Sequence, residues 1–456
     1  MVEVTAKLKS YLAPFMQYLV KADNPWLVGG AIRDTIIGLP VKDFDFAIKD
    51  RASEFAKWIA KKLKGTFVLL DAKNDEARVV CKWHPVWNKP QGEFTLDFTH
   101  MDKIEEDLAR RDFRLNAIAS KLPELELFDP LQGMQDIEEK RIRIISEKSL
   151  IEDPLRVLRG FRLSATLEFK IGKATLTALA KHSIKLKLPT VAPERVHEEL
   201  FKLLGAKSSY KVMRQMAKLG ILQVIIPEVE PMERIPQGKP GGNLLDHSLL
   251  TLKKIEDISI SGLVVAAYDL PLLKLVALLH DIGKPYCYSE DANGKVHFYG
   301  HEEKGVELLQ SIRDRIKLSN YELKILQSLI RLHMRPHLLA REKSPTNKAI
   351  WRLVRDGGDD TPCVLLLAYA DALASGGRGR GRLLELLNRG ISLWEEVRRP
   401  KFKRILTGDD LIEMGFKPSP VFKKILERVE ELQVSGELHT REEAIQFVKK
   451  NFTPSR

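Results

Sequence analysis

The feature that most constrains the fold is one segment, residues 27–47, which reads LVGGAIRDTIIGLPVKDFDFA. A short apolar run leads through two glycines into a helix-like stretch, and the segment ends in a strand-like DFDFA. Glycines let the backbone approach a phosphate, and a helix N-terminus offers free N–H groups to it. Residues two apart in a strand point to the same face, so Asp43 and Asp45 could together hold a pair of Mg²⁺ ions. The segment therefore predicts a phosphoryl-transfer centre.

Composition indicates a globular protein that works with a polyanion. The chain has 456 residues, of which 44% are hydrophobic and 30% charged, which suits two to four domains. No apolar run approaches the roughly 20 residues of a membrane span, and the N-terminal segment lacks a signal-peptide core. Three widely spaced cysteines indicate a reducing compartment, so we expect a cytoplasmic protein without a membrane partner. The net charge of +12 suits nucleic acid.

A second motif, RRDFRLNA, lies in a stretch that the pattern predicts to be helix-like (residues 105–120). It follows a predicted helix at 52–64 and strand-like runs at 66–72, 76–83 and 93–99. Paired arginines beside an aspartate can hold a nucleotide phosphate or sugar. An isolated RRD, by contrast, is usually a surface charge cluster.

The segment IEDPLRVLRGFRLSATL (151–167) carries a further polar pattern. Asp153 and Arg156 are three apart, so on a helix they share a face, and Arg159 and Arg162 continue a basic ridge. An aspartate and an arginine side by side can present acceptors and donors to the Watson–Crick edge of a base. The alternative is an intrahelical salt bridge on the surface.

A Pro/Gly-rich stretch at 227–242 predicts a linker. Beyond it, the candidate functional residues are histidines and aspartates. Such ligands suit a divalent metal that activates water against a phosphate ester. The set resembles that of the HD phosphohydrolases, above all in the run HDIGKP, and the alternative is an inactive helical domain. The resemblance assigns the metal to His247, His280, Asp281 and Asp371, with His301 and His333 for a second metal or a phosphate. We expect His297 and His337 at the surface.

The order of LVGGAIRD, Gly38, DFD, RRDFRLNA and EDPLR resembles the polymerase-beta-like nucleotidyltransferases. The resemblance is to the bacterial class II tRNA nucleotidyltransferases and their poly(A) polymerase relatives, with an appended HD domain. It implies an α+β fold in which a catalytic head (1–148) is followed by an all-α neck (149–230), an HD domain (231–378) and a helical tail (379–456). The chain departs from the family pattern at Arg114, where threonine is usual, and at Ser419-Pro420.

The resemblance also implies partners and roles. The substrates would be tRNA, CTP and ATP, the head would use Mg²⁺, and the tail would bind the elbow of tRNA. Asp97 would supply a third catalytic carboxylate, although a solvent-facing strand residue fits its pattern as well. Arg111 would contact the nucleotide, Asp112 and Asn116 would shape the sugar pocket, and Asp153 with Arg156 would read C or A. Arg159 and Arg162 would support the triphosphate or primer end. The remaining nucleotide-binding residues would be Gly29, Gly30 and Arg33.

Our expectation of which nucleotides the enzyme adds depends on the chain segment between Asp97 and the RRD motif. Family members that add the whole CCA end carry a long flexible segment before the RRD motif, whereas here only residues 98–109 separate Asp97 from Arg110. We therefore expect CC addition, with A left to a partner enzyme. The alternative subtypes are complete CCA addition, A addition and poly(A) synthesis. Two alternatives are of another class. One is an HD phosphohydrolase acting on 2′,3′-cyclic or 2′-phosphates as an additional or main activity, and the other is a non-catalytic tRNA-binding scaffold.

Overall fold

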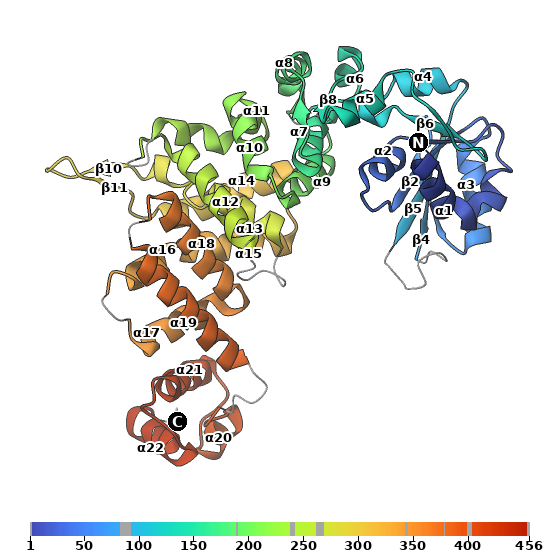
Figure 1. Ribbon diagram of the computed structural model, residues 1–456. Helices are drawn as coiled ribbons and strands as arrows, with labels where there is room; N and C mark the ends of the chain where they lie inside the picture. Colours follow the sequence, from blue (N-terminus) through green and yellow to red (C-terminus); the bar gives the residue numbers. More distant parts are fainter. Residues whose placement is uncertain are drawn as a thin grey trace. The chain divides into compact units, whose positions relative to one another are not determined.

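The computed structural model of the protein divides into two compact units, residues 1–199 and 200–456 (Figure 1). The structure describes residues 2–82, 93–187, 190–237, 242–260, 269–342, 345–377, 379–398 and 404–453. Among the described helices, none has both the length and the apolar character needed to cross a membrane.

A mixed seven-stranded sheet forms the centre of the first unit, in the order β3-β4-β5-β2-β1-β6-β7. All neighbours pair antiparallel except β2 and β5, which are parallel. The strands are β1 (Trp26–Val28), β2 (Asp43–Ile48), β3 (Thr66–Asp71), β4 (Glu76–Cys81), β5 (Phe94–His100), β6 (Ala119–Lys121) and β7 (Glu126–Phe128). The strands expected at 66–72, 76–83 and 93–99 are therefore present.

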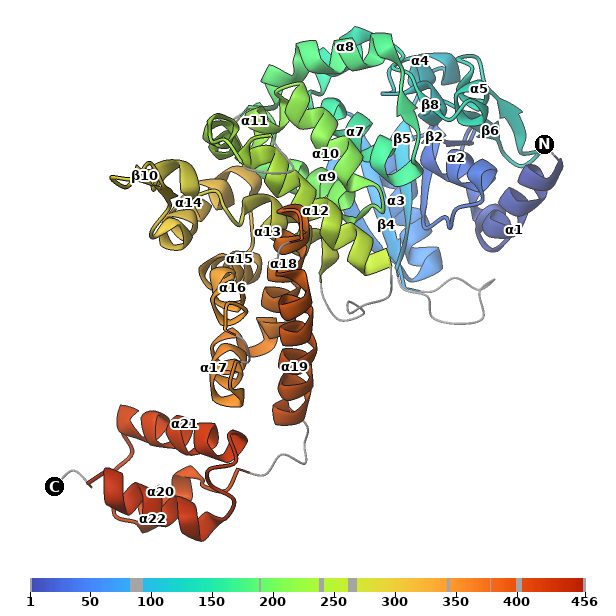
Figure 2. The same cartoon turned by 60° about the vertical axis from the view of Figure 1, so that its left-hand side comes forward.

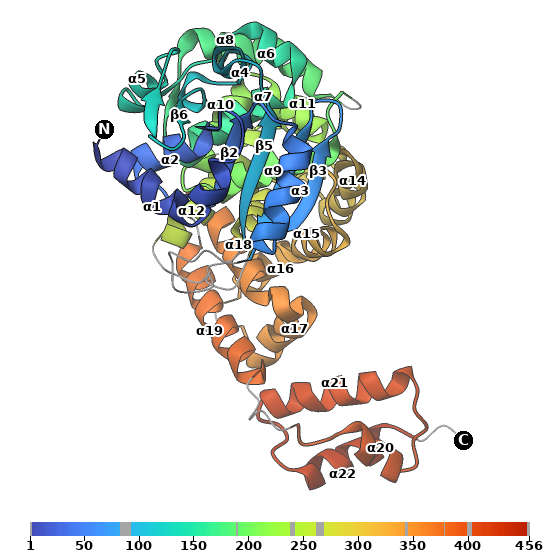
Figure 3. The same cartoon turned by 90° about the vertical axis from the view of Figure 1, so that its right-hand side faces the viewer.

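One face of this sheet is apolar because the strands alternate. Phe44, Phe46 and Phe98 are fully buried, and Phe55 of α3 (Ala52–Leu63) meets the Phe98 ring edge-on at 5.3 Å. Figure 3 shows α3 lying along β3 and β5. The alternate residues of β2 and β5, which include the aspartates, therefore face away from α3. The other helices of the head are α1 (Val2–Leu19), α2 (Gly30–Ile37), α4 (Ile104–Ala109) and α5 (Gly133–Glu138).

The RRD motif is not helical, which corrects the expectation for residues 105–120. Helix α4 ends at Ala109, and after an irregular stretch a single 3₁₀ turn spans Arg114–Asn116. Phe113 is fully buried and anchors this irregular segment in the core. The neck that follows contains α6 (Glu147–Glu152), α7 (Leu155–Leu167), α8 (Lys173–His182) and α9 (Pro193–Gly205), with β8 (Arg141–Ile142) paired to β9 (Lys170–Ile171).

The second unit is helical apart from a small hairpin, β10 (Ser289–Glu290) and β11 (Val296–His297). Its first helices are α10 (Ser209–Lys218), α11 (Ile221–Ile225), α12 (Leu244–Ile260), α13 (Leu270–Leu279), α14 (His301–Ile316) and α15 (Asn320–Leu332). They continue with α16 (Met334–Leu339), α17 (Asn347–Gly357), α18 (Thr361–Ala374) and α19 (Arg380–Arg398). Helix α18 packs against α12, α13 and α19, and Figure 2 shows α17 beside α19.

Two further expectations for this unit can be compared with the structure. The predicted linker is wrong over Pro227–Arg234, which forms a 3₁₀ helix with Val229 and Met232 buried, while residues 238–241 lie outside the described part. The helical tail is present as α20 (Gly408–Glu413), α21 (Pro420–Val434) and α22 (Arg441–Asn451). These three helices share an apolar core of their own. Figures 1 and 2 show them packed together.

Candidate active site

Three carboxylates lie in a row on the open face of the head sheet. The parallel pairing of β2 with β5 sets Asp45 beside Asp97, and Asp43 lies two residues earlier on the same face. The hydroxyl of Thr95 donates to Asp43 Oδ1 at 2.7 Å. Asp97 is therefore next to the DxD pair, and its exposed fraction is only 18%.

The electrostatics of this row fit a divalent cation. Burial, together with the neighbouring Asp97 and Asp43, raises the pKa of Asp45 to about 6, although Arg111 opposes the shift. Arg78 pairs with Asp97 and Arg111 lies near Asp45, but three clustered carboxylates still favour a proton or a metal ion. Oxygen ligands of this kind are the ones that Mg²⁺ takes in phosphoryl-transfer sites. The donor set therefore fits the expected metal.

Beside the carboxylates, the chain turns sharply into α2. Gly29 has φ +77°, and a Cβ there would lie 2.6 Å from an Arg111 guanidinium nitrogen and 3.2 Å from Asp45 Oδ2. The positive φ disfavours any larger residue here, and its Cβ would displace the Arg111 guanidinium. Arg111 itself donates to the buried Asp107 at 3.0 Å. Burial alone would lower the pKa of Arg111, but Asp107 and Asp45 hold it above its ordinary value.

A chain of polar contacts joins α2 to the neck helices within the first unit. Arg33 donates to Asn116 Oδ1, and Asn116 donates to Asp112 Oδ1 at 2.9 Å. Asp112 Oδ2 also accepts from Arg159 at 3.3 Å. Arg159 and Arg162 both donate to Glu199, at 3.2 and 2.7 Å. The RRD motif is thus fixed to α7 by ion pairs and hydrogen bonds, with Glu199 as an anchor that the sequence did not single out.

Asp153 and Arg156 do not lie on one helix, which corrects the expectation that they share a helical face. Asp153 is extended and caps the end of α6, before α7 begins at Leu155. Its carboxylate accepts from Arg195 at 2.8 Å, whereas the Arg156 side chain donates to the carbonyl of Arg110 at 2.8 Å. The Arg156 Nε is buried and has no hydrogen-bond partner among the described residues. Pro154 explains the difference, since the residue before a proline is pushed out of the helical region.

A cleft of about 1280 Å³ collects these groups. Most of the nucleotide-site residues expected from the sequence line it: Gly30, Arg33, Asp43, Asp45, Asp97, Arg111, Asp112, Asn116, Arg156, Arg159 and Arg162. Gly29 and Asp153 are not among the lining residues. The cleft is also lined by Leu70, Lys73, Asn74, Glu76 and Arg78 of the β3–β4 region, which sequence reasoning missed. These five carry no motif, and only the strand pairing brings them to the site.

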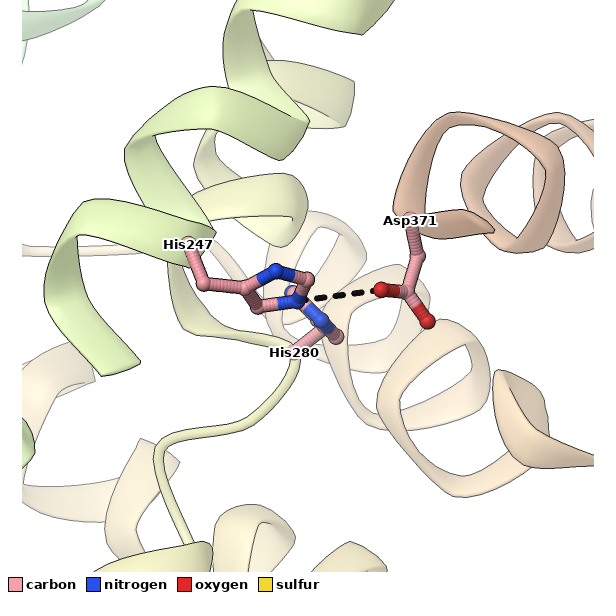
Figure 4. A group of neighbouring side chains, drawn as sticks. All are labelled: His247, His280 and Asp371. Atoms are coloured by element: carbon pink, nitrogen blue, oxygen red, sulfur yellow. Dashed lines mark ion pairs between the residues drawn. The ribbon is translucent and has the colours of Figure 1, made fainter. Parts of the chain in front are cut away.

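In the second unit, six histidines and aspartates form two adjacent groups. Ligand atoms of His247, His280 and Asp371 lie within 4.8 Å of one another, as do those of Asp281, His301 and His333. Figure 4 shows His247 and His280 converging on Asp371, with His247 Nε2 3.0 Å from its Oδ1. Asp281 lies between the groups, since its Oδ2 is 3.3 Å from His280 Nε2 and its Oδ1 is 3.5 Å from His333 Nε2.

The surroundings of these ligands suit metal binding. The Nδ1 atoms of His280, His301 and His333 each donate to a backbone carbonyl three residues earlier, at 2.9, 2.8 and 2.7 Å, which leaves Nε2 free to coordinate. Buried His280 Nε2 and Asp281 Oδ1 lack a well-oriented hydrogen-bond partner among the described residues. Burial would raise the pKa of Asp281, but His280 and Lys284 hold it well below its usual range. Both groups therefore fit divalent ions.

Two remaining histidines differ from each other. His337 was expected at the surface, but its Nε2 lies 2.8 Å from Asp371 Oδ2 and its side chain is only 19% exposed, so that expectation is wrong. His297 was also expected at the surface, and its side chain is likewise only 20% exposed. It lies on the hairpin and pairs with Asp291 at 3.0 Å, apart from the two ligand groups.

Comparison with known proteins agrees with this geometry. A family model described as "Poly A polymerase head domain" matches residues 25–143. A second, "Probable RNA and SrmB-binding site of polymerase A", matches residues 168–233, and an HD domain model matches 244–376. The chain is 31% identical over 445 residues to an A-adding tRNA nucleotidyltransferase of Deinococcus radiodurans, covering 93% of this chain and 94% of that protein. The chain belongs to the tRNA nucleotidyltransferases. It is therefore an enzyme of the CCA-adding family.

Other relatives of this nucleotidyltransferase differ in what they add. A CC-adding tRNA nucleotidyltransferase of Thermus thermophilus is 33% identical over 433 residues, covering 92% of each chain. The fold matches that of the Thermotoga maritima CCA-adding enzyme solved with tRNA, with a TM-score of 0.65, 22% identity, and coverage of 98% of this chain and 94% of that one. The expected head, HD domain and α+β fold are thereby confirmed, whereas the nucleotide specificity is not set by these likenesses.

Proposed function

We propose that this nucleotidyltransferase adds C residues to the 3′ end of tRNA from CTP, with release of pyrophosphate. The observation that carries the proposal is the row of Asp43, Asp45 and Asp97 next to the N-terminus of α2, in a cleft lined by arginines. The O3′–Pα bond forms as the bond from Pα to the bridging oxygen breaks, so pyrophosphate leaves and the proton of the 3′-hydroxyl is released to solvent. Mg²⁺ held by the carboxylates would stabilise charge on the attacking and leaving oxygens.

The remaining residues of the cleft bind and orient the nucleotide. Arg33 and Arg111, with the backbone at the start of α2, would hold the triphosphate. Asp112 and Asn116 would fix the sugar, because both are already held in place. Asp112 accepts from the backbone N–H of Phe113 and from the Asn116 amide. Arg156 would face the base. The half-buried Arg159 and Arg162, which both pair with Glu199, would support it. Asp153 is bound by Arg195 in this conformation, so base reading through Asp153 requires that ion pair to open or to share the carboxylate.

The proposal is tested by removing a carboxylate. Asp45→Ala should lower the rate of nucleotide addition by about 10³-fold, the usual order for loss of a charge-stabilising group, while tRNA binding stays close to wild type. Asp102→Ala removes an exposed carboxylate near the head sheet and serves as the matched control. Addition at the wild-type rate by Asp45→Ala would exclude the head as the reaction centre.

The choice of CC addition rests on the connection between Asp97 and the RRD motif. In the structure, residues 98–109 consist of the end of β5, a short turn and α4. Such an ordered connection leaves no room for the long flexible segment associated with the switch from C to A. The measurement is incorporation of labelled CTP or ATP into tRNA that lacks its 3′ end. Incorporation of A onto tRNA ending in CC would reject CC-only addition, and with it the need for a partner A-adding enzyme.

A second activity is supported by the two ligand groups of the HD domain. We propose a metal-dependent phosphohydrolase acting on 2′,3′-cyclic or 2′-phosphates. When bound, the divalent ions would supply an activated water, while the paired histidines and aspartates hold the ions in place. Hydrolysis of a 2′,3′-cyclic nucleotide should disappear in Asp281→Ala and persist in Asp291→Ala, an aspartate on the nearby hairpin. Hydrolysis that survives Asp281→Ala would assign the activity elsewhere.

A further inference from the structure

The row of carboxylates divides the open face of the head sheet into two sides. Strand register sets Asp45 opposite Val28 of β1 on one side and beside Asp97 of β5 on the other. Asp97 is in turn opposite Arg78 of β4, and Arg78 is opposite Val68 of the edge strand β3. The glycine turn, α2 and Arg111 lie on the Val28 side. Arg78 and the β3–β4 hairpin lie on the far side, at successive strand spacings of about 4.8 Å.

The far side carries side chains that the nucleotide site does not use. Arg78 donates to both oxygens of Asp97, through Nε at 2.8 Å and a terminal nitrogen at 2.7 Å, while 40% of its side chain is exposed. Leu70, Lys73 and Asn74 also line the cleft. Leu70 is 47% exposed and lies where the pairing of β3 with β4 shifts register.

Reaction geometry requires a second ligand on this side. In phosphoryl transfer, the attacking oxygen and the leaving oxygen lie roughly in line on opposite sides of the phosphorus. The residues of the Val28 side suit the triphosphate, so the leaving pyrophosphate lies there. The attacking hydroxyl must therefore come from the β3–β4 side, past Asp97.

We propose that the β3–β4 hairpin is the subsite for the 3′-terminal nucleotide of the RNA. This inference rests on the proposed nucleotide-addition activity of the head. Leu70 offers an apolar surface to the terminal sugar or base, and Lys73 contacts a backbone phosphate. Arg78 is a positioning residue, since its planar guanidinium fixes both oxygens of Asp97 beside the terminal hydroxyl.

Matched pairs of exposed residues test the subsite. Lys73→Ala is compared with Lys61→Ala on α3, and Leu70→Ala is compared with Leu69→Ala. Leu69 is 48% exposed, close to the 47% of Leu70, but it does not line the cleft. Steady-state rates are measured with RNA varied at saturating CTP, and with CTP varied at saturating RNA. The RNA is a fluorescent acceptor-stem hairpin without its 3′ CCA, which also reports Kd by anisotropy.

The subsite predicts a specific pattern. Lys73→Ala and Leu70→Ala should each raise the KM and Kd for the hairpin by about fivefold, with the KM for CTP unchanged. The two control variants should match wild type. A raised KM for CTP, or values equal to the controls, would overturn the subsite while leaving nucleotide addition intact. Absence of addition in the wild type would instead refute the proposed function itself.

Arg78 needs a different readout because it acts through Asp97. Arg78→Lys keeps the charge but cannot bind both carboxylate oxygens at once, and Arg78→Gln loses the charge as well. Both should lower kcat by about tenfold or more without changing the KM for CTP. Recovery of wild-type kcat in Arg78→Lys would show that charge alone matters and would overturn the positioning role.

Discussion

Replacing Glu199 by glutamine tests the ion pairs that hold the neck helix α7 against the RRD motif. Glu199 is 7% exposed and accepts from Arg159 at 3.2 Å and from Arg162 at 2.7 Å. Arg159 retains a second partner in Asp112, but Arg162 has no other carboxylate among the described residues. Burial and the nearby Arg159 lower the pKa of Arg162, whereas Glu199 opposes this shift, so Glu199 is the group that balances the charge of Arg162. The variant therefore leaves one half-buried cation uncompensated.

The size of the effect follows from burial. Removing one partner of a buried ion pair costs about 3–5 kcal/mol. The two arginines are 31% and 20% exposed, so solvent screens part of the lost interaction and we take the lower end, about 3 kcal/mol. Such a loss corresponds to roughly 100-fold faster local opening.

Hydrogen-exchange mass spectrometry on the full chain measures this opening region by region. Peptides from α7 and the start of α9 should exchange roughly 100-fold faster in Glu199→Gln, while peptides from the second unit should not change. Glu198→Gln, an exposed neighbour on the same helix, is the matched control and should stay within about 0.5 kcal/mol of wild type. A change below about 1 kcal/mol in Glu199→Gln would refute the view that these pairs hold the neck.

Three further outcomes are expected. Burial alone would raise the pKa of Glu228, but Arg315, at 2.6 and 2.7 Å, and a nearby serine lower it below 4.5. The Glu228–Arg315 ion pair therefore stabilises the fold above pH 4.5, and this stabilisation is lost as the pH falls further. The urea midpoint of the wild type should fall with pH in this range, and that of Glu228→Gln should fall less. Burial raises the pKa of Cys81 to about 11 and of Cys363 to about 12, so neither thiol forms the reactive thiolate readily at pH 7.5. Iodoacetamide at that pH should therefore label the half-buried Cys287 first, which peptide mass spectrometry can measure. Affinity for tRNA should fall linearly on a log–log plot against salt, and a flat line would contradict phosphate binding.

Local pattern was sufficient for some parts of the site and not for others. Asp43 and Asp45 could be placed on one face because strand alternation is a property of the segment itself. Arg78 could not be found in this way, because it reaches Asp97 only through the pairing of β4 with β5. Likewise, His337 reads as an ordinary surface histidine, and only the packing of α16 on α18 brings it to Asp371.

The interpretation of the base-reading segment failed for a different reason. The spacing of Asp153 and Arg156 fits one helical face, but Pro154 ends the helix between them and starts a new one. Arg195, 42 residues further along the chain, then takes the place of the expected partner. The RRD motif shows the same limit, because burial of Phe113 outweighs the helical pattern around it.

The parallel pairing of β2 with β5 has a consequence for how this head can be altered. Register runs without interruption from Asp43 opposite Thr95 to Ile48 opposite His100. One residue inserted within Phe94–Leu96 would turn Asp97 towards α3 and remove it from the carboxylate row. Substitutions that keep the length of both strands preserve this register. A change of a single residue in the length of either strand is therefore enough to separate the third carboxylate from the DxD pair.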